Sequence, residues 1–347
     1  MSWAGMRTVG GEPRGIDYEL PDARIAQSPV EPRDEARLLD ATGAELAHRR
    51  VSELPDLVGP GDVVVVNDTR VIRARLALAK PTGGAVEVML LDPDAEPGGD
   101  GAWRALVKPS RRVRPGTAVV DAEGQPVLVV EDDLGEGVRR VRSATDEPVL
   151  THAARHGAVP LPPYITTPLG DPERYQTVYS RDERSVAAPT AGLHLTPALL
   201  DGVRSAGAEL LTVELAVGLG TFRPILVDDV TDHTMHGEQF VVSDDVVDAC
   251  RAADRVIAIG TTTVRALESA ATFGVGSGVT ELFIRPGYDW KLVDVLFTNF
   301  HQPRSSLLVM LAAFAGPRWR DIYAEALVGD YRFLSFGDAM IVDRAAP

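Results

Sequence analysis

The strand pattern of the chain changes character twice, and this change limits the folds that the chain can adopt. From about Lys80 to Val149, short β-rich pieces are separated by Gly, Pro and Asp at close spacing, which is typical of a small all-β module. After Pro160, apolar strands alternate with helical segments, which predicts an α/β sheet. We therefore expect an α/β fold in which a large α/β domain, formed from both ends of the chain, carries an inserted small all-β, barrel-like domain.

The domain boundaries follow from the same change in pattern. The large α/β domain is predicted at residues 16–78 and 158–347, and the inserted β-rich domain at 79–157. Residues 1–15 are polar and Gly-containing, and we expect them to form a flexible extension. A length of 347 residues suits two domains.

Local signals predict individual elements. Between Asp17 and Leu76 they indicate a short helix near Glu35–Leu39 and a hairpin with strands Val63–Val66 and Val71–Leu76. Thr196 and Pro197 suit the N-cap and the first position of a helix that Gly207 ends. The predicted helices of the α/β part are Ala198–Ala206, Asp244–Ala253, Val264–Ala271 and Leu307–Ala315, and the segment ELFI at 281–284 is predicted as a strand.

The single cysteine, Cys250, excludes an internal disulfide and a cysteine-based zinc site. Such a composition fits a reducing compartment, so we expect a cytoplasmic protein with no structural metal. The N-terminus lacks the apolar region of a secretory signal. The longest apolar run, Leu307–Ala315, is far shorter than the roughly 20 residues of a membrane span, so we expect no membrane role.

Charge is distributed unevenly. A formal net charge of -15 and a pI near 4.9 argue against a protein that coats nucleic acid without specificity. The stretch Trp103–Gly116 nevertheless holds five basic residues and no acidic one. This local excess is large enough to bind a phosphate backbone, and the simpler alternative is a solvated strand face.

A run of small residues precedes one histidine in the stretch Ser185–Leu200. Residues 186–192 hold one Val and otherwise only Ala, Pro, Thr and Gly, so the backbone there can approach a planar or anionic ligand. His194 follows just before a helix begins. The alternative is a tight loop in which His194 is a hydrogen-bonded core residue.

Three more loops follow candidate strands, the position where ligands bind in α/β sheets. They are Gly218–Pro224, Gly260–Thr263 with Arg265 one turn later, and Thr298–Ser306. Helix capping is the simpler explanation for Thr262 and Ser305. With Met235–Phe240, however, these loops collect several titratable side chains, which predicts a proton-transfer enzyme: His194, His236, Glu238 and His301. No serine elbow, cysteine nucleophile or His–Glu metal spacing appears in the sequence, which disfavours acyl transfer and metal-dependent hydrolysis.

A series of motifs runs in order through nearly the whole chain. They are DYELPDARIAQSP, VVVVNDTRVIRARL, VPLPPYI, ERYQTVYS, SVAAPTAGLHLT, GLGTFRPI, MHGEQF, GTTTVRALES, the segment from ELFIRPGYDW to LAAFAG, and YRFLSFGDAM. In these motifs the chain resembles the S-adenosylmethionine:tRNA ribosyltransferase-isomerases, a family of queuosine biosynthesis. Only the N-terminal extension and the β-rich middle match loosely.

The resemblance implies a specific reaction. The family transfers and isomerises the ribosyl group of S-adenosylmethionine onto the 7-aminomethyl-7-deazaguanine at the wobble position of tRNA, which gives epoxyqueuosine and releases adenine and methionine. S-adenosylmethionine is then a co-substrate, and no bound cofactor or metal is expected. We expect a monomer or a weak homo-oligomer whose partner is tRNA with a modified wobble base. The family's fold, a large α/β domain with an inserted β-barrel, agrees with the organisation inferred above.

Roles for individual residues follow from the resemblance. A base must remove a proton beside the sulfonium, and departing adenine needs a proton or a hydrogen bond, so acid–base chemistry is expected at His194, His301, Glu238 and Asp68 without a division of roles. Thr261–Thr263 with Arg265 would hold the methionine carboxylate, and Tyr179 or Phe222 would lie against a base. The expected substrate-binding residues are Asn67, Arg70, Tyr179, Pro189, Thr190, Gly192, Gly220, Thr221, Phe222, His236, Thr261, Thr262, Arg265 and Asn299. The expected RNA contacts are Lys108, Arg111, Arg112 and Arg114.

The chain departs from the family pattern at four positions. Ala216 replaces a histidine beside the GLGTF loop, Gly237 replaces a serine, Leu195 replaces a phenylalanine, and Arg184 stands where a glycine is usual. Two alternatives therefore stay open: a paralogue that uses S-adenosylmethionine with a different acceptor, and a noncatalytic RNA-binding relative.

Overall fold

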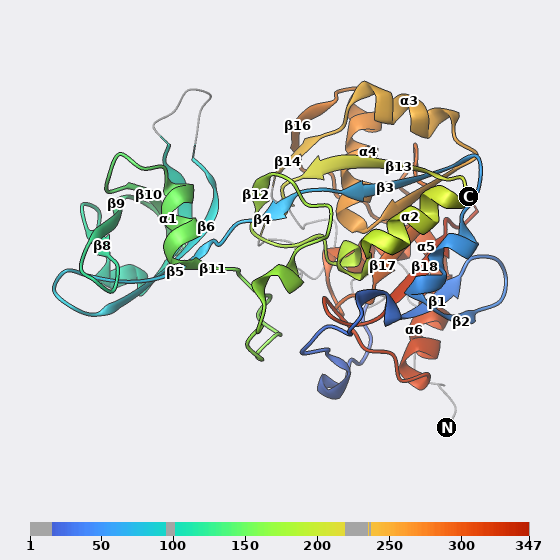
Figure 1. Ribbon diagram of the computed structural model, residues 1–347, viewed down its shortest axis with the longest axis horizontal. Coiled ribbons are helices and arrows are strands. Elements are labelled where there is room, and N and C mark those ends of the chain that lie inside the picture. The colour runs from blue at the N-terminus through green and yellow to red at the C-terminus, as the bar shows by residue number, and fades with distance from the viewer. Residues whose placement is uncertain (1–15, 95–100, 219–234, 236, 347) are drawn as a thin grey trace.

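The computed structural model describes residues 16–94, 101–218, 235 and 237–346. Figure 1 shows these residues in two lobes of unequal size, which extended segments near β4 (Arg70–Val71) connect. The large lobe places helices around a central sheet, whereas the small lobe consists mostly of strands. This arrangement confirms the predicted α/β class with an all-β insertion.

The large lobe is built on a nine-stranded sheet with the order β16-β14-β13-β3-β15-β17-β18-β1-β2. Its four central neighbours, β13, β3, β15 and β17, are parallel, so their carboxyl ends meet at one edge. The strands are β1 (Arg37–Ala41), β2 (Ala47–Arg50), β3 (Asp62–Asn67), β13 (Glu209–Leu215), β14 (Glu238–Val241), β15 (Arg255–Ile259), β16 (Ser277–Thr280), β17 (Val295–Asn299) and β18 (Ala339–Asp343).

The apolar run of β3 explains its central place. All six residues of β3 are buried because the sheet is covered on both faces. Val63 and Val65 pack into one apolar layer, with helices α3 to α6, and Val64 and Val66 pack into the other, with α2. Each buried valine contributes roughly 1.5–3 kcal/mol to the free energy of unfolding, which fixes the register of this strand.

The predicted helices of the α/β part are confirmed. Thr196 caps α2 as expected, because its hydroxyl accepts a hydrogen bond from the Leu199 amide at 3.1 Å. The helices are α1 (Val149–His156), α2 (Pro197–Ser205), α3 (Asp244–Ala252), α4 (Thr261–Phe273), α5 (Ser306–Ala315) and α6 (Trp319–Val328). The short 3-10 helices are η2 (Asp22–Arg24), η3 (Arg33–Glu35), η4 (Val51–Leu57), η5 (Ser110–Arg112), η6 (Pro172–Tyr175), η7 (Thr190–His194) and η10 (Gly316–Arg318).

The small lobe is a seven-stranded sheet with the order β11-β5-β6-β7-β10-β9-β8. An added pairing between β5 and β8 closes it into a barrel. Its strands are β5 (Arg75–Ala79), β6 (Ala85–Pro93), β7 (Trp103–Lys108), β8 (Ala118–Val120), β9 (Pro126–Gly135), β10 (Val138–Ser143) and β11 (Gly157–Ala158). The boundaries at 78/79 and 157/158 stay a prediction, and we propose residues 75–158 for the inserted domain because its outermost strands reach that far.

Three local predictions were wrong. Val63–Val66 and Val71–Leu76 form no hairpin, since β3 pairs in parallel with β13 and β15, and Val71 belongs to β4, which pairs with β12 (Glu183–Ser185). Residues 37–39 lie in a strand rather than a helix, because consecutive buried leucines suit a sheet covered on both faces. The segment 281–284 is not a strand. The nearest strand, β16, ends before it at Thr280.

Candidate active site

The carboxyl ends of β13, β3, β15 and β17 form the floor of the candidate site. Asn67, at the end of β3, donates hydrogen bonds to the Leu215 carbonyl and the Thr262 hydroxyl, each at 3.1 Å. Its side-chain oxygen accepts from the amides of Leu215 and Thr69 at 3.1 and 3.2 Å. These four bonds use the full hydrogen-bonding capacity of the carboxamide. Asn67 therefore ties three strand ends together beneath the site.

Two adjoining cavities lie above this floor, each about 30 Å³ in volume. They share the residues Thr190, Asn299, His301 and Leu307. The first cavity also contacts the turn from Gly260 to Thr262, and the second also contacts Tyr164 and Ser335. The predicted loops of 186–192, 260–263 and 298–306 are thus neighbours in space.

Gly260 makes the turn between β15 and α4 possible. Its φ is +91°, in the region that favours glycine, and a Cβ there would lie 3.4 Å from the Ala191 side chain. The glycine lets η7 and the start of α4 approach each other closely. Thr261 and Thr262 follow at the amino end of α4 and line the first cavity.

Asn299 links two of the predicted loops. Its amide group lies 2.9 Å from Nε2 of His194, and its side-chain oxygen accepts a hydrogen bond from the Thr190 hydroxyl at 2.9 Å. Since an amide nitrogen only donates, Nε2 of His194 is the acceptor, and the proton of the neutral ring sits on Nδ1. Burial lowers the pKa of His194 to about 4, and the nearby charge of Arg332 acts in the same direction.

His301 is the second buried histidine of the site. Its Nε2 lies 3.1 Å from the Thr298 hydroxyl, and its backbone amide donates to the Tyr323 hydroxyl at 2.8 Å. Burial lowers the pKa of His301 to about 3. Both histidines are therefore neutral near pH 7. In this state neither can act as a general acid in the imidazolium form.

Glu238 and Arg265 form a buried ion pair beside the cavities. Oε1 of Glu238 accepts from the Gly218 amide at 2.9 Å, while Oε2 bonds to the Arg265 guanidinium. Arg265 also donates to the carbonyls of Thr280 and Leu282, each at 3.3 Å. Burial lowers the pKa of Arg265 to about 10. The guanidinium predicted to hold a substrate carboxylate thus has a carboxylate of the chain itself as its partner, although it still borders a small cavity with Thr261 and Thr262.

Several predicted site residues do not line the two adjoining cavities. Asp68 lies 3.4 Å from the guanidinium of Arg181, and burial raises its pKa. Tyr179 packs with the apolar cluster of α2. Arg70 pairs with Glu173, Asn67 bonds to the Thr262 hydroxyl, and Gly192 packs against Tyr179. His194 does not line these cavities either, although it bonds to Asn299, which does. Gly220, Thr221, Phe222 and His236 lie outside the described residues.

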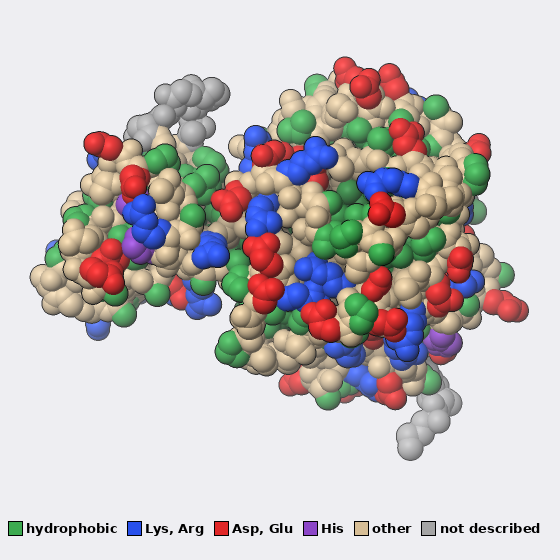
Figure 2. All heavy atoms as spheres, viewed as in Figure 1, with side chains coloured by type: hydrophobic (Ala, Val, Ile, Leu, Met, Phe, Trp, Pro, Cys, Tyr) green, Lys and Arg blue, Asp and Glu red, His purple; other side chains and the backbone are tan. Residues whose placement is uncertain are grey.

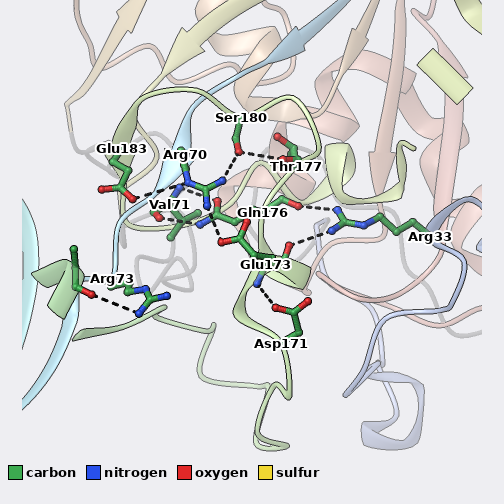
Figure 3. A network of polar contacts seen from close by, with 11 residues as sticks. Arg33, Arg70, Val71, Arg73, Asp171, Glu173, Gln176, Thr177, Ser180 and Glu183 are labelled. Carbon is green, nitrogen blue, oxygen red and sulfur yellow. Dashed lines mark hydrogen bonds and ion pairs between the residues drawn. The ribbon is translucent and has the colours of Figure 1, made fainter. Parts of the chain in front are cut away.

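Arg70 belongs to a polar network that we call the Gln176 clasp, made of Arg33, Arg70, Val71, Glu173 and Gln176 (Figure 3). The Gln176 side chain accepts from the Val71 amide at 3.0 Å and donates to the Val71 carbonyl at 2.9 Å, as a neighbouring strand would. Arg70 donates to Glu173 at 2.7 Å, and Arg33 donates to the Gln176 carbonyl at 2.7 Å. The clasp fixes the segment that leads to η7. The sequence motif ERYQTVYS contained Gln176, but nothing in the pattern indicated its partner.

Gly192 permits the closest contact in this region, and replacing it tests the packing. A Cβ at Gly192 would overlap the Tyr179 hydroxyl. We expect Gly192→Ala to lower the free energy of unfolding by about 1–3 kcal/mol and to reduce activity, because η7 carries His194. Thermal unfolding and steady-state kinetics measure the two effects. Gly170→Ala is the matched control, since a Cβ there meets nothing within 4 Å; equal behaviour of the two variants would contradict the prediction.

Known proteins resemble this chain over nearly its whole length. The model of a family described as queuosine biosynthesis protein matches residues 14–342. The S-adenosylmethionine:tRNA ribosyltransferase-isomerase of Rubrobacter xylanophilus is 49% identical over 330 residues, which cover 94% of this chain and 96% of that protein. The chain belongs to the S-adenosylmethionine:tRNA ribosyltransferase-isomerase family.

Further relatives agree. The S-adenosylmethionine:tRNA ribosyltransferase-isomerase of Thermus thermophilus is 47% identical over 348 residues, covering 94% of this chain and 98% of its own. A crystal structure of an S-adenosylmethionine tRNA ribosyltransferase from Thermotoga maritima shares 34% identity, with a TM-score of 0.53. That likeness covers 94% of this chain and 99% of the other. The family resemblance inferred from the motifs is confirmed.

The four departures from the ribosyltransferase-isomerase pattern have local structural settings. Leu195 is buried in the apolar layer of α2, and the Arg184 guanidinium pairs with Glu214 at 3.1 Å. A Cβ at Gly237 would lie 2.7 Å from the Val279 side chain, so a serine there needs a shift of Val279. The Ala216 amide donates to the Gln239 carbonyl at 2.9 Å. None of the four lines either cavity.

The basic stretch lies on the barrel. Four arginines of its strands, Arg104, Arg139, Arg140 and Arg142, form ion pairs with acidic neighbours. In the described part of the chain, Arg111, Arg112 and Arg114 are exposed and have no such pair. Figure 2 shows Lys, Arg and acidic side chains interspersed over the large lobe, so no single sign dominates that face.

Among the described residues, no group of three or more His, Cys, Asp or Glu side chains is arranged to hold a metal ion. No helix among the described segments has the length and apolar content of a membrane span.

Proposed function

We propose that this chain transfers and isomerises the ribosyl group of S-adenosylmethionine onto the 7-aminomethyl-7-deazaguanine wobble base of tRNA, with release of adenine and methionine. The observation that carries the proposal is the meeting of the family's motifs at one edge of the sheet: Thr262, Asn299 and His301 line one cavity, and His194 bonds to Asn299. We place this activity in the cytoplasm, where its tRNA substrate is found.

The neutral histidines suit the first chemical task. The sulfonium of S-adenosylmethionine acidifies the neighbouring C5′ protons, and a neutral imidazole can take one of them. We assign this role to His194 or His301, both of which contact Asn299 or share its cavity. Burial keeps each imidazole unprotonated near pH 7. The lone pair of His194 accepts the hydrogen bond from Asn299, so His194 takes a substrate proton only when that bond breaks, whereas His301 lines the cavity itself.

The start of α4 suits the methionine end of the substrate. Helix amino ends attract anions, and Thr261 and Thr262 line the cavity there. The buried Glu238–Arg265 pair lies beside this turn and holds Gly218, from which the GLGTF loop continues. In this proposal the pair is a support, and the carboxylate of methionine binds the helix end and its threonines.

One assay tests the proposal as a whole. The protein is incubated with S-adenosylmethionine and tRNA that carries the aminomethyl-deazaguanine, and free adenine and the mass of the RNA are followed. The proposal expects adenine release and a matching mass gain that both depend on tRNA. Adenine release without tRNA would favour the paralogue with another acceptor. Binding of tRNA without binding of S-adenosylmethionine, measured by calorimetry, would favour the noncatalytic relative.

The basic stretch supplies a separate prediction about RNA binding. Replacing Arg111, Arg112 and Arg114 together by Gln is expected to raise the KM for tRNA at least tenfold, with the KM for S-adenosylmethionine unchanged. Each lost phosphate contact should lower the slope of log affinity against log salt by about 0.7–0.9. The control is Arg204→Gln, which removes an exposed arginine of α2 that pairs with Asp201. An unchanged salt slope in the triple variant would show that the stretch is only a solvated surface.

A further inference from the structure

A groove much larger than the two adjoining cavities lies outside the candidate active site. Its volume is about 560 Å³, in the size range of pockets that bind small organic molecules, and it lies between the barrel and the connection that follows it. One wall is the outer face of β5, β6 and β7, and the other is the segment 158–168. Figure 1 shows β6 and β11 on the side of the small lobe that faces the large lobe.

The barrel wall of the groove has an unusual composition for an outer face. Arg75 pairs in register with Met89, and Met89 with Leu106, so these three side chains lie in a row across three strands. Met89 and Leu106 are half-buried, although they point away from the barrel core. Glu87 and Lys108 form the next row, and Glu87 accepts two hydrogen bonds from Arg75, at 2.8 and 2.6 Å.

Charge and shape in the groove favour an anionic ligand with an apolar part. Arg75 neutralises Glu87, whereas Lys108 is exposed and has no acidic partner among the described residues. The groove therefore has an excess positive charge in a chain whose net charge is -15. The opposite wall contains Pro162, Pro163, Ile165 and Pro168, whose rigid apolar surfaces suit the face of a base or ribose.

The position of the groove relates it to the candidate active site. Within the connection, Tyr164 lines the cavity of His301 and bonds to the Ser335 hydroxyl at 2.6 Å, while Ile165 lines the groove. Consecutive residues thus line the cavity of His301 and the groove, so a single segment of the chain separates the two. If the modified base binds beside the cavity of His301, a nucleotide next to it in the RNA lies within reach of this wall.

We propose that the groove binds a nucleotide that adjoins the modified base in the tRNA, with its phosphate at Lys108 and its base or sugar between Met89, Leu106 and the proline wall. This inference rests on the proposed function, because it names a further contact of the same substrate. It places RNA recognition on both lobes at once, with the reacting base in the large lobe and its neighbour against the barrel.

Three variants on the same two strands test the groove. Met89→Glu adds a carboxylate to its floor, and Lys108→Gln removes its unpaired cation. Arg104→Gln is the matched control, because Arg104 is exposed on the same face of β7, pairs with Asp92 and does not line the groove. The KM for tRNA should rise more than tenfold in Met89→Glu and about three- to tenfold in Lys108→Gln. The salt slope of Lys108→Gln should fall by about 0.7–0.9, and Arg104→Gln should match the parent chain.

A binding readout keeps this test separate from the reaction. tRNA with 4-thiouridine next to the wobble position is irradiated on the full-length protein, and the crosslinked peptide is identified by mass spectrometry. Crosslinks within residues 85–91, 104–108 or 158–168 support the groove even if no adenine is released, which would count against the proposed function alone. Crosslinks elsewhere, or equal KM values for tRNA in all three variants, would overturn the groove. The groove would also be overturned if Met89→Glu weakened the binding of S-adenosylmethionine as much as the binding of tRNA.

Discussion

Replacing Arg265 by Met is expected to lower the free energy of unfolding by about 3–5 kcal/mol and to abolish activity. Arg265 and Glu238 are both almost fully buried, so the change leaves a carboxylate in the interior without its cation. The carbonyls of Thr280 and Leu282 lose a donor at the same time. Because Glu238 also holds the Gly218 amide, an unpaired and displaced carboxylate weakens the anchor of the GLGTF loop.

The double variant Arg265→Met with Glu238→Met separates stability from function. Removing both charges avoids the cost of an unpaired ion, and such exchanges are often nearly neutral, so most of the lost stability should return. Activity should not return, since Glu238→Met removes the carboxylate that holds the Gly218 amide. Urea denaturation of each variant gives the free energies. Arg251→Met is the control, because Arg251 forms an exposed pair with Asp248 and should change stability by less than about 1 kcal/mol. A double variant no more stable than the single one would refute the assignment of the pair as an internal support.

Replacing His194 by Gln is expected to reduce kcat by about 10²–10⁴-fold, the usual contribution of a positioned base. The glutamine oxygen can still accept the hydrogen bond from Asn299, so the packing is retained and the chemistry is lost. His48→Gln, which alters a half-exposed histidine next to Tyr331, should keep activity near that of the parent chain. If His301→Gln alone causes a loss of this size and His194→Gln does not, His301 is the base and His194 only positions Asn299.

The same two histidines predict how stability depends on pH. In the unfolded chain a histidine titrates near pH 6.5, whereas burial lowers the pKa to about 4 at His194 and about 3 at His301. Between these values the unfolded state binds more protons, so the free energy of unfolding falls as pH decreases below 6.5, by up to about 1.4 kcal/mol per pH unit for each histidine. Their full contribution is present above pH 6.5. Each His→Gln change should remove the contribution of one histidine to the slope of the free energy of unfolding against pH. Urea denaturation between pH 5 and 7 would measure this slope.

The sequence predicted the architecture well where the signal is local. Capped helices such as α2 and the apolar run of β3 were recognisable, because capping residues and buried strands leave marks within a few positions. The false hairpin at 63–76 shows the limit. Val63–Val66 and Val71 find partners more than 100 residues away, in β13 and in β12, and no local pattern encodes such a pairing.

The candidate site was predictable as a set of loops but not as a set of contacts. The positions of small residues and histidines after strands indicated that 186–192, 260–263 and 298–306 would meet, as they do at the cavities, because parallel strands end at one edge. The meeting of 219–224 with them stays a prediction. The bond between Asn299 and His194 and the pairing of Glu238 with Arg265 depend on how separate turns approach each other. The same is true of Gln176, whose backbone-like contact with Val71 has no counterpart in its neighbouring sequence.

The pairing of Arg75 with Ala158 determines how the barrel could be removed from this fold. The chain leaves for the barrel and comes back at adjacent residues of an antiparallel pair, whose Cα atoms lie about 5 Å apart. A tight turn of two residues can bridge such a gap, so the barrel can be removed without changing the path of the main sheet. A shortened chain that joins residues 74 and 159 by Asn-Gly should still fold and bind S-adenosylmethionine, while its affinity for tRNA is lost.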